Sequence, residues 1–159
     1  DETMNVGLQG CDDREGKAYR AAIGYKLSLP GLLRGAISTS PTCLIRLDLA
    51  SLKDLGAADA SAQVRMVREA HAMLGGGGAT SLQAGTKYRV RLSRVGEAVT
   101  VEVAGRVVVK AKDGAYPRGF VALYCDSMPT SSTDVSVSWD DVHIVGRLNP
   151  AWLSAELGK

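Results

Sequence analysis

The sequence predicts an all-β protein, folded as an antiparallel β-sandwich with little helix. From Thr86 to Gly146, four runs alternate apolar and polar residues, as strands with one buried face do. These runs are TKYRVRLSRV, AVTVEVAGRVVVKAK, GFVALYC and DVSVSWDDVHIV. Gly and Pro turn residues separate them, and no strand–helix–strand alternation indicates a parallel α/β fold.

Further strand-like runs occupy the N-terminal half. The first of them ends in the polar stretch GCDDREGK, and a Pro-Gly turn signal lies within Ser28 to Leu33. The stretch from Ser51 to Ala60 is rich in Asp, Ala and Gly and predicts a loop, with one helical turn at Leu52 to Leu55. The patterns between these breaks predict strands at residues 3–9, 18–27, 34–38 and 42–49.

The segment from Ala62 to Leu74 fits both types of element. A helical spacing is kept by Val64, Val67, His71 and Leu74, and the four glycines that follow are a helix stop signal. The triplet VRM also alternates as a strand does. We expect a strand, because tertiary context often overrides helix propensity, and a helix is the alternative.

Length and composition predict one domain and exclude several partners. A chain of 159 residues, 45% of them apolar, can bury one core, so we expect one sandwich domain over residues 1–159, with 147–159 as a C-terminal tail packed on it. No apolar run approaches the ~20 residues that span a bilayer, which predicts no membrane insertion. The chain opens on Asp1 without a signal-peptide pattern, which indicates a processed form or an excised domain and leaves the compartment open.

The cysteines and histidines are too few and too scattered to indicate a metal centre or a catalytic triad. Cys11, Cys43 and Cys125 form no CxxC pair. We expect three buried thiols, with a Cys11–Cys43 disulfide as the alternative. His71 and His143 are expected to have structural roles, and no G-x-S-x-G nucleophile motif is present.

The last third of the chain carries an ordered set of motifs. The run YRVRLSRVGEAVTVEVAGRVVVKAKD has a Gly turn and an Ala-Gly-Arg hairpin, and RGFVALYC and VSVSWDDVHIVG follow it. This tract resembles the closing strands of concanavalin A-like jelly-roll domains, in particular laminin-G-like and 3-keto-disaccharide hydrolase-like domains. The resemblance implies a concanavalin A-like jelly roll and an extracellular or cell-surface location. Such domains include hydrolases, lectins, carbohydrate-binding modules and protein-binding domains, so the fold alone selects no activity.

The carboxylates do not match the catalytic pattern that this resemblance implies. Family 16-type hydrolases carry Glu-x-Asp-x-x-Glu on one strand, which places the acidic groups on one face, and the chain lacks this motif. Its adjacent pairs, Asp12-Asp13 and Asp140-Asp141, would point to opposite faces of a strand. The second pair is expected to bind turn amides. The alternative is a calcium site that this pair forms with Asp113, Asp126 and Asp134.

Ligand recognition is assigned to loops. Tyr116, in the loop from Ala111 to Arg118, is the best candidate for an exposed ring that stacks on a sugar. Asp113 and Arg118 in the same loop, and Asp126 at the start of the next, supply hydrogen-bonding and charged groups.

A stripe of cations near one hairpin predicts a solvated sheet face. Its members would pair with Glu97 and Glu102 across strands, and stacking aromatics typical of nucleic-acid binding are absent from it. With a net charge of only +2, no nucleic-acid partner is expected. The stripe consists of Lys87, Arg89, Arg91, Arg94 and Arg106.

The sequence therefore predicts a non-catalytic carbohydrate-binding or recognition module, with calcium as the one cofactor alternative. Two other functions stay open: a glycoside hydrolase of the 3-keto-disaccharide hydrolase type, and a protein-interaction module of a larger protein. The concave sheet face should discriminate between them. An aromatic residue beside Asp or Asn favours sugar binding, clustered carboxylates favour hydrolysis, and a featureless face favours a protein partner. The oligomeric state is not indicated.

Overall fold

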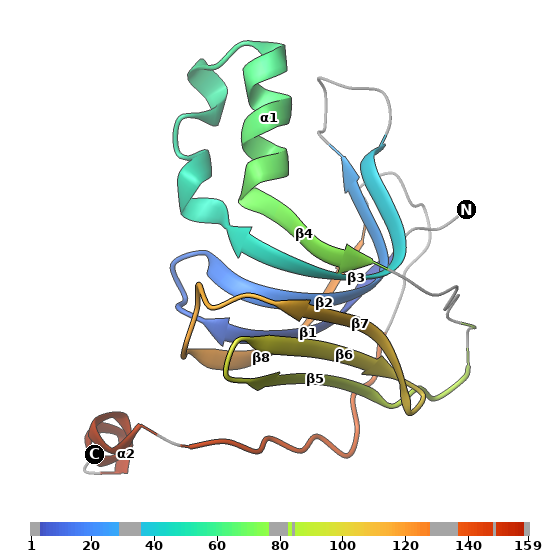
Figure 1. Cartoon of the computed structure of the whole chain (residues 1–159), viewed down its shortest axis with the longest axis vertical. Coiled ribbons are helices and arrows are strands. Elements are labelled where there is room, and N and C mark those ends of the chain that lie inside the picture. Colours follow the sequence, from blue (N-terminus) through green and yellow to red (C-terminus); the bar gives the residue numbers. More distant parts are fainter. Residues whose placement is uncertain are drawn as a thin grey trace.

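The fold is a two-layer antiparallel β-sandwich, as the sequence predicts. The computed structural model describes residues 4–28, 36–76, 83, 85–127, 137–147 and 149–157. Sheet A has five strands in the order β4-β3-β2-β1-β8, and sheet B has three in the order β5-β6-β7. The two sheets lie face to face (Figure 1).

Sheet A joins the N-terminal half of the chain to one strand from the last third. Its strands are β1 (Met4–Asp12), β2 (Lys17–Ser28), β3 (Ala36–Asp48), β4 (His71–Gly76) and β8 (Phe120–Ser127). The long strand β3 replaces the two shorter strands expected over residues 34–49. Strand β1 lies between β2 and β8, so it pairs with both neighbours: Val6 faces Ile23 on one side and Cys125 on the other.

Sheet B is a meander that follows the predicted alternation. Its strands are β5 (Val90–Val95), β6 (Ala98–Val103) and β7 (Arg106–Lys112). Val99, Val101 and Val103 are buried, and the residues between them are more exposed. The predicted hairpin turn at Ala104-Gly105 is confirmed: the two residues have φ values of 52° and 77°, the pattern of a type I′ turn.

The main core lies between the two sheets. Alternate residues of each strand face this space because successive side chains point to opposite sides of a sheet. Its buried members are Val6, Tyr19, Ala21, Ile23 and Leu44 of sheet A and Val99, Val101, Val103 and Val109 of sheet B. A second buried cluster lies on the face of sheet A turned away from sheet B, here called the outer face. It comprises Ala18, Ala22, Cys43, Ile45 and Leu47, with Tyr124 packed against it.

The ambiguous segment contains both a helix and a strand. Helix α1 spans Ala60–Ala70, so the strand expected from Ala62 onward is wrong for these residues, and the helical alternative is confirmed. The Asp59 side chain accepts a hydrogen bond from the backbone N–H of Ala62, which caps the helix start. Val67 and Ala70 are buried on one side of the helix. The chain then becomes extended at His71 and enters β4, where pairing with β3 decides the structure.

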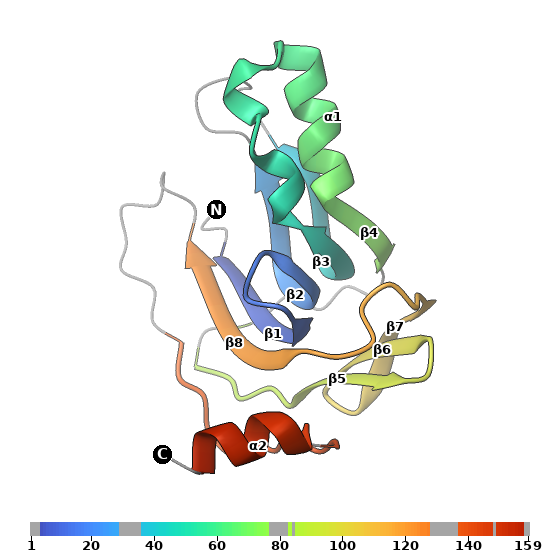
Figure 2. The ribbon, with the colours of Figure 1, turned by 90° about the vertical axis from the view of Figure 1, so that its left-hand side faces the viewer.

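The helical part of the chain stands on the outer side of sheet A. Two 3-10 helices, η1 (Leu49–Leu52) and η2 (Leu55–Ala57), precede α1 in the stretch predicted as a loop. Helix α1 packs against β3, β4 and these two helices, on the opposite side of sheet A from sheet B (Figure 2). No helix in the described ranges is long and apolar enough to cross a membrane.

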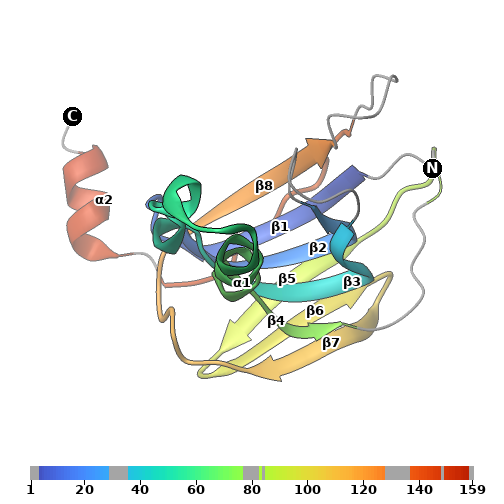
Figure 3. The same cartoon turned by 90° about the horizontal axis from the view of Figure 1, so that it is seen from above.

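The last predicted strand is not formed in the part of it that the structure describes. Residues 137–147 have no strand pairing, although Val137 and Trp139 keep the expected alternation and pack against the main core. Asp141 has a φ of 53°, which interrupts the extended backbone a strand needs. Beyond it, helix α2 (Pro150–Leu157) stands apart from both sheets instead of packing on them (Figures 1 and 3).

Candidate functional site

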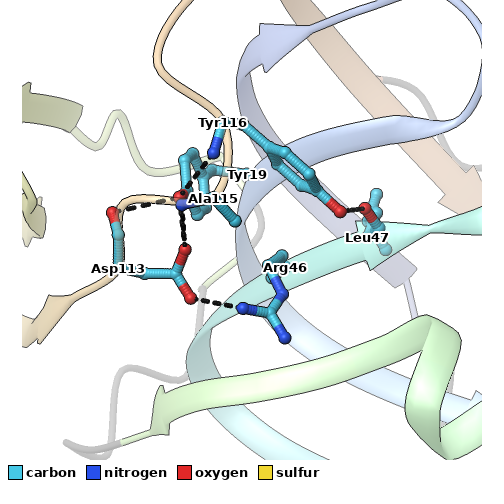
Figure 4. A network of polar contacts seen from close by, with 6 residues as sticks. All are labelled: Tyr19, Arg46, Leu47, Asp113, Ala115 and Tyr116. Carbon is cyan, nitrogen blue, oxygen red and sulfur yellow. Dashed lines mark hydrogen bonds and ion pairs between the residues drawn. The ribbon is translucent and has the colours of Figure 1, made fainter.

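Two of the four predicted ligand-binding residues meet in a polar network at one end of the sandwich (Figure 4). Asp113 follows β7, and its carboxylate accepts hydrogen bonds from Tyr19 Oη at 2.5 Å and Arg46 Nη1 at 2.7 Å. The backbone N–H of Ala115 donates to the same carboxylate at 2.9 Å. Tyr19 and Arg46 are register partners on β2 and β3, so sheet A presents both groups to the loop together.

The charge of Asp113 is stabilised within this network. Burial raises the pKa of Asp113, but the hydrogen bonds from Tyr19, Ala115 and Arg46 and the Arg46 charge outweigh this, so the pKa lies below its ordinary value. Burial and the bond to Asp113 raise the pKa of Tyr19, which keeps its hydroxyl protonated and donating. The Asp113 side chain is only 8% exposed, so little of it remains for a ligand.

Tyr116 is part of the same anchor, and its expected exposure is wrong. Its ring is partly buried against the main core and lies 5.3 Å from the ring of Tyr19, tilted by 48°. Its hydroxyl donates to the Leu47 carbonyl at 2.8 Å, and its backbone N–H donates to Tyr19 Oη at 3.2 Å. A ring held in this way fastens the loop to β2 and β3 and leaves only part of its surface exposed for a ligand.

The other two predicted residues lie elsewhere. Arg118 is exposed in the loop before β8. Asp126 lies near the end of β8, with its backbone opposite Asn5, and its side chain is outside the described residues. Because a strand rises ~3.3 Å per residue, Asp126 is about 20 Å along β8 from the start of the strand at Phe120. The structure therefore brings Asp113 and Tyr116 together and leaves Arg118 and Asp126 outside their network.

Each histidine makes a side-chain hydrogen bond within the chain. His71 Nδ1 lies 2.9 Å from the Val67 carbonyl, so this nitrogen carries the proton and donates. Burial lowers the pKa of His71. His143 is exposed and contacts Asp141 at 2.9 Å.

All three cysteines are free thiols. Burial raises the pKa of Cys43 to about 12, although the charge of Arg20 lowers it slightly, so this thiol is no nucleophile at neutral pH. Cys11 is partly buried between the sheets and Cys43 lies on the outer face, which rules out the alternative disulfide. Cys125 is exposed, contrary to the expectation of three buried thiols.

Two members of the cationic stripe, Lys87 and Arg91, make ion pairs at the surface. Asp140 accepts a hydrogen bond from Lys87 at 2.7 Å, with both side chains largely exposed. Among the residues that the structure describes, no turn amide donates to Asp140, contrary to the expectation for this pair. Arg91 faces Glu102 across β5 and β6 at 4.0 Å, as a solvated sheet face predicts. Within the described ranges, no group of three His, Cys, Asp or Glu side chains is arranged to hold a metal ion.

A second polar group lies on the outer face, at the side of sheet A formed by β8, β1 and β2. Arg20 donates through Nε to Gln9 Oε1 at 3.0 Å, and its guanidinium lies 4.3 Å from the centroid of the Tyr124 ring. Gln9 Nε2 in turn donates to Asp12 at 2.8 Å. At the end of this row the Arg14 guanidinium lies 3.7 Å from the centroid of the Phe120 ring. We call these six residues the outer-face cluster: Gln9, Asp12, Arg14, Arg20, Phe120 and Tyr124.

A β-bulge in β1 builds this cluster. Gln9 faces Ala122 and Asp12 faces Phe120, so β1 carries one residue more than β8 over this stretch, and Cys11 has a φ of 53°. In a regular strand, residues three positions apart point to opposite faces; the extra residue puts Gln9 and Asp12 on one face.

Sequence patterns did not reveal the outer-face cluster. Residues 10–17 look like a polar turn, and Gln9 looks like the end of the strand before it. One signal was available: Phe120, Ala122 and Tyr124 alternate along a predicted strand and therefore share a face.

Comparison of the chain with protein-family models, with curated proteins and with solved structures gives no match.

Proposed function

We propose that this protein is a non-catalytic carbohydrate-recognition module whose ligand lies on the outer face of sheet A. The observation that carries this proposal is the row of an amide, two guanidinium groups and two aromatic rings in the outer-face cluster. Tyr124, Arg20 and Gln9 are partly exposed and lie on three adjacent strands. Sugar hydroxyls both donate and accept hydrogen bonds, and amide and guanidinium groups match them.

The orientation of the Gln9 amide is held by its neighbours before any ligand arrives. Gln9 is held at both ends, because its oxygen accepts from Arg20 and its nitrogen donates to Asp12. Its amide still has a second N–H and a second lone pair. Side chains locked by their neighbours lose less conformational entropy on binding, which favours affinity.

The described part of the cluster has the chemistry of binding more than that of hydrolysis. A glycosidase needs two carboxyl groups on either side of the scissile bond, ~5–10 Å apart. Asp12 supplies one carboxylate here, and its oxygens accept from Gln9 Nε2 and from the backbone N–H of Arg14. A carboxylate engaged in this way orients the Gln9 amide beside it.

A glycan array with the purified chain tests the proposal. We expect binding that Gln9→Ala and Tyr124→Ala reduce and that Tyr124→Phe retains, with circular dichroism to verify that each variant is folded. Tyr116→Phe is the matched control, because it alters a tyrosine at the end of the sandwich, outside the outer-face cluster. If the array gives no binding to any glycan, or if Tyr116→Phe reduces binding as much as Tyr124→Ala, the proposal is wrong.

A further inference from the structure

We infer that the glycan is acidic, a polysaccharide that carries carboxylate or sulfate groups on successive units; this inference rests on the proposed function. The outer-face cluster presents two guanidinium groups, Arg14 and Arg20, each above an aromatic ring. Stacking on a ring fixes the plane of the guanidinium group. The N–H groups along the edge of that plane stay available to donate to an oxyanion. Carboxylate and sulfate groups accept from that edge, often in pairs.

These two cations are not neutralised by the part of the chain that the structure describes. There, the ion pairs within 4.0 Å involve Arg46, Lys87, Arg91 and His143, and neither Arg14 nor Arg20. The nearby carboxylates bind other donors. Asp12 accepts from Gln9 and from a backbone N–H, and Asp13 accepts from the backbone N–H groups of Glu15 and Lys17.

The spacing of the two cations indicates a polymer. Phe120 and Tyr124 are four residues apart on β8, so the rings beneath the guanidinium groups lie about 13 Å apart along one face. A single small anion cannot contact both groups at that distance. A chain of sugar rings with an anionic group on successive units can.

The rest of the site favours a glycan over a phosphate polymer. Gln9, between the two cations, suits hydroxyl groups. The net charge of +2 for the whole chain adds little attraction for nucleic acid.

The experiment compares matched acidic and neutral polymers by isothermal titration calorimetry. Polygalacturonate is tested against its methyl ester, and dextran sulfate against dextran, so that only the charge differs within each pair. We expect at least one acidic polymer to bind about ten-fold more tightly than its neutral partner, with affinity falling as salt is added. Arg14→Gln and Arg20→Gln should each weaken this binding about five-fold, and the double variant should remove the preference for charge.

Arg106→Gln is the control for net charge, because it removes one cation from the exposed start of β7 in sheet B. Acidic and neutral polymers that bind equally well would overturn the inference and leave the proposed function standing. Absence of binding to every glycan would overturn both. Inorganic polyphosphate is the third probe. If it binds as tightly as the acidic glycans and loses the same affinity in the arginine variants, the site binds polyanions in general, and the inference is wrong.

Discussion

At the scale of single residues, Asp113 is the side chain whose loss should cost most stability among the exposed-loop residues. Its carboxylate accepts hydrogen bonds from Tyr19, from Arg46 and from a backbone N–H, and its side chain is only 8% exposed. Asp113→Asn keeps the shape and removes the charge, and we expect it to lower the free energy of unfolding by about 1–3 kcal/mol in urea titrations. Asp140→Asn breaks the exposed ion pair with Lys87 and should leave the midpoint of the urea unfolding transition unchanged. Equal effects of the two substitutions would refute the anchoring role of Asp113.

The same residue should contribute to acid sensitivity. Because hydrogen bonding and Arg46 hold the pKa of Asp113 below its ordinary value of 3.8, its ionised form stabilises the fold fully above that value. This contribution is lost as pH falls through the lower pKa of the folded state. Asp113→Asn should therefore lose less stability than the wild type between neutral and strongly acidic pH. Parallel slopes of stability against pH in the two proteins would contradict this assignment.

The network around Asp113 and Tyr116 was only partly predictable from the sequence. Asp113 and Tyr116 stand out as polar and aromatic residues of one loop, and the structure does place them together. Their partners Tyr19 and Arg46 come from distant strands, and no local pattern indicates that contact. For this reason Tyr116 looked like an open stacking ring when its hydroxyl is in fact bound to Leu47.

At the scale of elements, Gly119 is required where the loop enters β8. Its φ is 155°, and a Cβ there would lie 2.3 Å from the Cys11 carbonyl carbon and 2.5 Å from the Asp12 nitrogen. Gly119→Ala should cost about 3 kcal/mol or more in thermal or urea unfolding, since backbone must move. Gly96→Ala, at a φ of 60° with open space around it, should cost only about 1 kcal/mol. A Gly119→Ala variant as stable as Gly96→Ala would disprove the close approach.

The hairpin between β6 and β7 offers a substitution that should stabilise the protein. Ala104 has a φ of 52°, a conformation that alanine adopts poorly and asparagine tolerates. Ala104→Asn creates the Asn-Gly sequence preferred in type I′ turns and should raise the free energy of unfolding by about 0.5–1 kcal/mol. Ala115→Asn, in a loop outside any hairpin, is the comparison. An unchanged or lower melting temperature for Ala104→Asn would contradict the turn type.

Elements with strong two-residue alternation were predictable, and elements decided by tertiary contacts were not. Strands β5 to β8 follow their patterns because one face of each needs burial. Helix α1 gave mixed signals, and the Asp59 cap together with burial of Val67 selected the helix. The alternation of the last run is real, since Val137 and Trp139 face the core, yet alternation alone does not supply a pairing partner.

At the scale of the whole molecule, the main core should stabilise both sheets together, and α2 should contribute little to the free energy of unfolding. Residues of both sheets form the main core, and Trp139 packs against it from outside the sheets. Trp139→Ala should lower the free energy of unfolding by about 1–3 kcal/mol, because the ring is only partly buried. Removal of residues 149–159, which include α2, should leave the melting temperature unchanged. A large loss on that truncation would show that the tail packs on the sandwich after all.

The global architecture was predictable, and the position of the candidate site was not. Composition and alternation require two apolar faces to meet, which gives the sandwich. The outer-face cluster depends on one extra residue in β1 and on the pairing of β1 with β8, and both are properties of the assembled sheet.

That pairing also shapes how the chain acquires its structure. During synthesis, β1 and β2 leave the ribosome early, but β1 has an open edge until β8 has been made. Contacts between such distant strands slow folding, and an unpaired edge invites association with other chains. We therefore expect the nascent protein to be most prone to association with other chains in the interval between the emergence of β1 and the arrival of β8.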